Sequence, residues 1–145
     1  MAERYSKQWN MDTYGLRDPS NWFDALMASG DEKAIAEYRA TLDEYERRQI
    51  EQKRLTDIAF KDYYRRKKTG ETEASPEATD AWNKYMYNLY QNMLDGYDGK
   101  PSQLENLMER RNLSESERQA VLDRRFKLFP WREYEWENWK AGGWG

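Results

Sequence analysis

The architecture of this chain is set by residues 31–68, DEKAIAEYRATLDEYERRQIEQKRLTDIAFKDYYRRKK. It contains neither Pro nor Gly, and it is rich in Ala, Glu, Arg and Lys, which favour helices. Ile35, Tyr38, Leu42 and Tyr45 recur at intervals of three and four, a spacing typical of one face of an amphipathic helix. The sequence therefore predicts one long helix over about 31–68.

The middle of this helix carries little apolar content, because Ile50 is the one large apolar side chain between residues 46 and 54. A straight helix of 38 residues is about 57 Å long, far beyond the radius of gyration of about 15 Å expected for a compact chain of this size. We therefore expect the helix either to bend near residues 49–53 or to project beyond the body of the protein.

Charges are segregated along the same helix. Residues 31–46 hold six acids and two bases, a net charge of −4, whereas residues 47–68 hold nine bases and three acids, a net charge of +6. Acids at the start and bases at the end match the helix dipole, which is one interpretation. The other is a docking signal, since an antiparallel copy or a partner helix of reversed polarity would place acid against base.

Residues that favour the ends of helices lie on both sides of the long helix and predict further helices. Asp18-Pro19 begins a short helix that Gly30 ends, and Ser75-Pro76 begins an amphipathic helix over about 76–94. Its apolar stripe includes Ala78, Ala81, Trp82, Tyr85, Met86, Leu89, Tyr90 and Met93.

Two S-x-x-E capping boxes follow, Ser102 with Glu105 and Ser114 with Glu117, and predict a helical hairpin that turns at Asn112. Pro130 then precedes a short Trp-rich helix. One Val and three Ile in the whole chain leave little β-branched content for a sheet. The predicted fold is all-α with five to six helices, divided into an extended arm (1–17), a helical domain (18–129) and an aromatic C-terminal interaction tail (130–145).

Composition excludes several classes of protein. The 145 residues include no Cys and no His, which excludes thiol nucleophiles, disulfides, Cys/His zinc sites and Ser-His-Asp triads. Neither a nucleophile–base arrangement nor a metal motif is present, so we expect no enzyme activity and no cofactor. No apolar run approaches the length of a membrane span, and residues 1–15 do not resemble a signal peptide. We expect an intracellular protein that is soluble or peripheral to a membrane complex.

The aromatic tail is the first candidate binding site. Seven Trp, 11 Tyr and 6 Met in the chain indicate a core of rings and thioethers, and four of the Trp fall between residues 131 and 144. Rings on more than one face of a short helix cannot all point inward, and exposed Trp and Tyr dominate protein-binding hot spots. The predicted partner-binding residues are Trp131, Tyr134, Trp136, Trp139 and Trp144.

A basic and aromatic cluster at the end of the long helix is the second candidate. It comprises Tyr63, Tyr64, Arg65, Arg66, Lys67 and Lys68. Such a cluster neutralises phosphates while its rings stack on bases, and it also suits an acidic protein partner. A helix end matched to the dipole is the structural alternative.

The segment Pro76–Tyr85, with Trp82, Lys84 and Tyr85 opening an aromatic helix, resembles a motif in the small helical accessory subunit on the matrix side of the cytochrome bc1 complex. The connector before it is longer than in that family, and the aromatic C-terminal tail departs from the family pattern. The resemblance implies an accessory subunit of a membrane-bound respiratory complex.

These observations lead to one expected function and two alternatives. We expect a non-enzymatic structural or accessory subunit of a multiprotein assembly, which binds other protein subunits through aromatic anchors and its charge-segregated helix. The first alternative is a small regulator, for example virus-encoded, that blocks a host protein or a nucleic acid. The second is the respiratory accessory subunit, with peripheral contact to a membrane.

Overall fold

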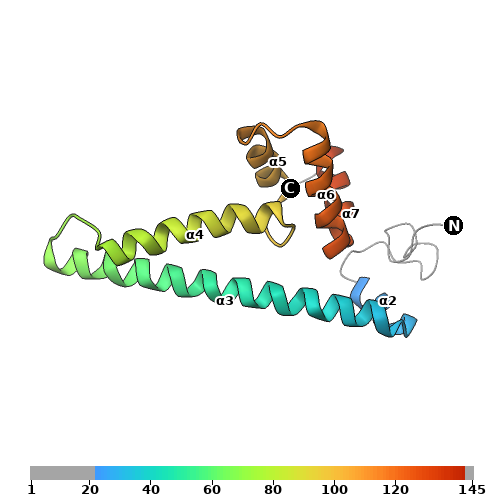
Figure 1. The fold of residues 1–145 in the computed structure, drawn as a ribbon, viewed down its shortest axis with the longest axis horizontal. Coiled ribbons are helices and arrows are strands. Elements are labelled where there is room, and N and C mark those ends of the chain that lie inside the picture. Colours follow the sequence, from blue (N-terminus) through green and yellow to red (C-terminus); the bar gives the residue numbers. More distant parts are fainter. Residues whose placement is uncertain (1–21, 143–145) are drawn as a thin grey trace.

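The computed structural model describes residues 22–142, and every regular element in that range is a helix (Figure 1). This confirms the predicted all-α class, with a long helix followed by an amphipathic one. The predicted arm (1–17) and the expected start of the first helix at Asp18 lie outside the described residues. The elements are α2 (Trp22–Ser29), α3 (Glu32–Thr69), α4 (Pro76–Leu94), α5 (Pro101–Arg110), α6 (Glu115–Leu128) and α7 (Trp131–Lys140).

Helix α3 is continuous across residues 49–53, so of the two expected outcomes the structure shows the projecting helix. Its start is set by Asp31, whose side chain accepts a hydrogen bond of 3.1 Å from the Ala34 N–H. Its end is set by Gly70, which adopts φ 79° and donates its N–H to the Arg66 carbonyl oxygen. The turn after α3 lies at the far end of the molecule from α6 and α7 (Figure 1).

Helix α4 returns antiparallel along α3 and forms a hairpin with it (Figure 1). Ser75 caps α4 by accepting from the Ala78 N–H at 3.1 Å, and Pro76 occupies the first turn. The side chains buried between the two helices include Leu55, Ala78 and Ala81. Because these side chains are few and mostly small, polar contacts contribute much of the interaction between α3 and α4.

The main apolar core lies at the C-terminal end of α4, where α5, α6 and α7 gather (Figure 1). We call α5–α7 the C-terminal lobe. The buried cluster there consists of Met93 of α4 and of Leu104, Leu107, Met108, Val121 and Trp136 of the lobe. An aromatic contact joins α2 to this region, because the Trp22 ring lies 5.5 Å from that of Trp131.

The capping box expected to begin α5 at Ser102 and Glu105 was wrong. Pro101 already occupies the first helical turn, and the Gln103 side chain accepts from the Lys100 N–H at 2.9 Å. Proline has its φ preset for a helix start, so α5 begins before Ser102. The Glu105 carboxylate instead pairs with Arg118 of α6.

The second capping box is confirmed. Ser114 Oγ accepts from the Glu117 N–H at 3.2 Å, and Glu117 Oε1 accepts from the Ser114 N–H at 3.0 Å. Asn112 adopts φ 51° in the turn between α5 and α6, which agrees with the predicted turn.

Among helices α2 to α7, none combines the length and apolar character that crossing a bilayer requires.

Candidate protein-interaction surface

A polar network holds α3 against α4 where the hairpin meets the C-terminal lobe. Arg48 donates to Asn92 Oδ1 at 2.8 Å and to Asp95 Oδ2 at 3.1 Å. Its guanidinium also lies 4.3 Å from the centroid of the Tyr97 ring, within cation–π range. The first part of the basic half of α3 is therefore used to fix the hairpin at its base.

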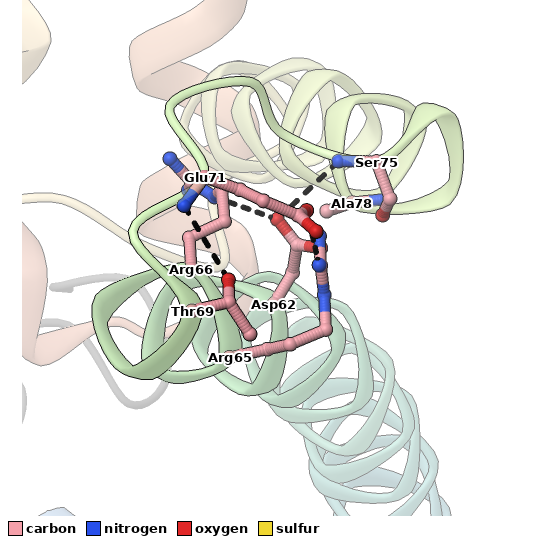
Figure 2. Close-up of polar contacts among 7 residues, drawn as sticks. All are labelled: Asp62, Arg65, Arg66, Thr69, Glu71, Ser75 and Ala78. Carbon is pink, nitrogen blue, oxygen red and sulfur yellow. Dashed lines mark hydrogen bonds and ion pairs between the residues drawn. The ribbon is translucent and has the colours of Figure 1, made fainter.

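A second network closes the tip of the hairpin, and Figure 2 shows it. The Asp62 carboxylate accepts from Arg65 Nη2 and from Arg66 Nε, both at 2.9 Å, and from the Ser75 N–H at 3.4 Å. Glu71 in the connecting turn pairs with Arg65 from the other side. The hydrogen bonds from Arg65, Ser75 and Arg66 lower the pKa of Asp62 to about 2.

The structure divides the predicted basic cluster into two parts. Arg65 and Arg66 serve the tip through their ion pairs with Asp62. Lys67 and Lys68 are exposed, and no acidic side chain within residues 22–142 forms an ion pair with either. The two tyrosines of the cluster are also exposed, with ring centroids 5.5 Å apart.

Exposed apolar side chains are concentrated on the hairpin. Tyr87 is the most open of them at 66% exposed, and the Trp82 ring stacks on that of Tyr85 at 5.3 Å while remaining 47% exposed. No large hydrophobic side chain of α5–α7 reaches the same degree of exposure. We call six hairpin residues the arm surface: Ile50, Phe60, Tyr63, Tyr64, Trp82 and Tyr87.

The rings predicted as anchors in α7 lie mostly within the C-terminal lobe. Trp136 is 8% exposed and belongs to the main core, and its ring lies 5.1 Å from that of Trp139. Trp131, Tyr134 and Trp139 are half-buried. Trp144 lies outside the described residues. The partner-binding role of this set stays a prediction, while the isolated chain already uses Trp136 for packing.

The sequence did not point to two arginines of the lobe, one of them fully buried and the other half-buried. Arg125 of α6 is fully buried and donates to the carbonyl oxygens of Asp98, at 2.8 Å, and Gly99 in the turn before α5. Arg132 of α7 donates to the same Gly99 oxygen at 3.3 Å. Burial, together with the nearby Arg132, lowers the pKa of Arg125 to about 10, and Glu135 acts in the opposite direction.

No sequence signal marks these arginines, because Arg125 stands in a run of charged residues that is typical of a solvated helix face. Its position depends on α6 and α7 folding back onto the turn that follows α4. The result is a rigid link that sets the direction of the hairpin relative to the lobe.

Two hollows of the described surface lie between α3 and α4. The charged lining of one of them includes Glu44, Arg47, Arg48 and Asp95, which form ion pairs with one another. Within residues 22–142, acidic side chains do not gather in groups of three that could hold a metal ion. The arm surface is therefore the feature of the described chain best suited to an interaction.

No family model, curated protein or solved structure matches the chain. The likeness of residues 76–85 to the respiratory accessory subunit therefore rests on those residues alone.

Proposed function

We propose that this protein is a non-enzymatic accessory subunit of a multiprotein assembly and that the α3–α4 hairpin is its binding arm. The observation that carries the proposal is the exposure of Trp82 and Tyr87 on α4, together with Phe60 and Tyr64 on α3. Each helix of the hairpin buries only the side that faces the other helix, so the hairpin itself leaves these rings uncovered. Trp and Tyr in such positions are the side chains that dominate binding energy when a partner covers them.

The geometry of the arm supports contact with proteins on more than one side. Trp82 and Tyr87 are five residues apart on α4, which separates them by about 140° around the helix axis. The tip between the helices is closed by the Asp62 network, so the arm is held as a preorganised element. A partner would meet a rigid rod whose rings are already in place.

Site-specific photo-crosslinking tests this proposal in the cells that produce the protein. A photoreactive amino acid would replace Trp82 in one variant and Tyr87 in another, with Asp123 on the exposed side of α6 as the matched control. We expect discrete protein adducts from positions 82 and 87, and none from position 123. Equal labelling at the three positions, or labelling at position 123 alone, would contradict the proposal.

A second candidate function rests on the exposed end of the basic cluster. Lys67 Nζ lies 6.0 Å from the centroid of the exposed Tyr63 ring, and the exposed Tyr64 and Lys68 belong to the same helix end, an arrangement that suits single-stranded nucleic acid. Binding of a labelled oligonucleotide by the purified chain, measured at rising salt, tests it. Salt-sensitive binding that the Lys67→Glu/Lys68→Glu variant loses would favour a nucleic-acid-binding regulator over the accessory subunit.

A further inference from the structure

The outward face of α3 carries a regular stripe of exposed side chains. Positions 43, 46, 50, 53, 57, 60, 64 and 67 are all exposed and alternate in steps of three and four, the spacing of a helix-pairing seam. The face of α3 that meets α4, which includes Gln52, Leu55 and Asp62, is offset from this stripe by two residues. Two residues turn a helix by about 200°, so the stripe points away from α4.

Figure 1 shows that α4 and the C-terminal lobe lie on one side of α3. Along residues 43–67 the described chain therefore leaves the outward stripe open. The stripe is about 36 Å long at 1.5 Å per residue, which is a length that a second helix can follow.

The side chains of the stripe are complementary to those of the same stripe running in the opposite direction, when the two are aligned at Leu55. Asp43 and Lys67 lie twelve residues on either side of Leu55, and Lys53 and Asp57 lie two residues on either side. An antiparallel copy centred at this level would therefore place acid against base at both positions. Two-fold symmetry forms each of these pairs twice.

The remaining positions agree with the same alignment. Ile50 would meet Phe60 of the other copy, so an apolar layer lies between the charged layers. Glu46 would meet Tyr64, whose hydroxyl is a hydrogen-bond donor. A parallel pairing in register would instead place each charged residue against its own copy, which is unfavourable.

The arginines beside the stripe already pair with acids of α3, so their charge does not repel a second copy. Arg47 pairs with Glu44 at 2.7 Å, and Arg54 pairs with Glu51 at 2.7 Å, both within α3. Polar layers are also how α3 already packs, since Arg48 and Gln52 on its inner face bond to α4. The outward stripe repeats that mode of packing with a symmetric partner.

We propose that the outward stripe of α3 binds the same stripe of a second copy of this chain in an antiparallel pair centred on Leu55. The inference deepens the proposed function and rests on it, because it assigns one of the arm's partners. It leaves Trp82 and Tyr87 on α4 for other proteins.

Sedimentation equilibrium of the purified full chain tests the proposal with two charge reversals. Lys53→Asp places acids at both 53 and 57, and Asp57→Lys places lysines at both, so either variant alone would repel its own copy. Mixed together, the two variants restore every acid–base contact. Asp80→Lys on the exposed side of α4 is the matched control, and circular dichroism verifies that each variant keeps its helices.

The wild type and the control should associate to twice the 17.6 kDa mass of the chain, more weakly as salt rises. Each single reversal should raise the dissociation constant at least about tenfold, and the equimolar mixture should recover the dimer. A wild type that stays monomeric, or a mixture that associates no better than its components, would overturn the inference. Photo-crosslinking at position 82 reads the proposed function separately, since α4 plays no part in this pair.

Discussion

The guanidinium of Arg125 in α6 donates a hydrogen bond of 2.8 Å to the carbonyl oxygen of Asp98, in the turn that ends the hairpin. The side chain is fully buried, so this contact lies inside the protein and not at its rim. It joins the C-terminal lobe to the base of the α3–α4 hairpin, and the direction of the hairpin depends on it.

We predict that Arg125→Met destabilises the protein by roughly 3 kcal/mol, because the Asp98 carbonyl oxygen loses its Arg125 donor and the Gly99 oxygen keeps only the hydrogen bond from Arg132. Urea unfolding followed by circular dichroism measures the free energy of unfolding. The neighbouring Arg124 is exposed, so Arg124→Met serves as control and should change that free energy by less than about 0.5 kcal/mol. Equal stability of the two variants would show that Arg125 does not act as the link described.

Asp62 should make the stability of the tip depend on pH. Its pKa is about 2 in the folded protein against an ordinary value of 3.8, so its contribution is complete above pH 3.8 and is lost as the pH falls towards 2. Asp62→Asn should therefore be less stable than the wild type at neutral pH, and the difference should shrink over that acidic range.

Thermal unfolding at a series of pH values checks this prediction, with Asp123→Asn on the exposed side of α6 as control. Should the deficit of Asp62→Asn stay constant down to pH 2, the ion pairs at the tip would not contribute to stability through the charge of Asp62.

The rings of α7 and of the arm should differ sharply in their effect on stability. Trp136→Ala removes a ring from the main core and should cost about 3–5 kcal/mol. Tyr87→Ala removes an exposed ring and should change the free energy of unfolding by less than about 0.5 kcal/mol. Chemical denaturation of both variants decides the matter, and a comparable loss for the two would contradict the assignment of core and surface.

Gly96 should tolerate no side chain. It adopts φ 95°, and a Cβ there would lie 2.8 Å from the Arg125 Cα. Gly96→Ala should therefore cost at least about 3 kcal/mol through strain and overlap. Gly70 is the matched control, since it also has a positive φ but an added Cβ meets nothing within 4 Å, so Gly70→Ala should cost only about 1–2 kcal/mol. Similar thermal midpoints for the two variants would refute the close approach.

The helices could be predicted where their limits depend on local chemistry. Asp31, Ser75 and Ser114 each accept a hydrogen bond from the first turn of their own helix, so a few neighbouring residues contain the signal. The start of α5 was misplaced because two signals overlapped there, and Pro101 acted before the Ser102 box. The segregated charge of α3 was also visible in the sequence.

The distribution of the rings could not be predicted, because it depends on contacts between distant segments. The short helix α7 carries rings on several sides, and we expected some of them to face a partner. In the structure α7 contacts both α5 and α6, and Trp131 also meets Trp22 of α2, so several sides of α7 are covered. Conversely, α3 and α4 cover only one side of each other, and their outer rings remain exposed.

Hydroxyl-radical footprinting can show whether other protein chains cover the arm surface in its native setting. Oxidation of Trp82, Tyr87, Phe60 and Tyr64 would be compared between the dilute purified chain and the same chain in freshly lysed source cells, with Leu122 of the lobe as internal reference. We predict that labelling of the arm residues falls several-fold in the lysate while that of Leu122 stays the same. Unchanged labelling of all four residues would mean that no other chain covers the arm surface.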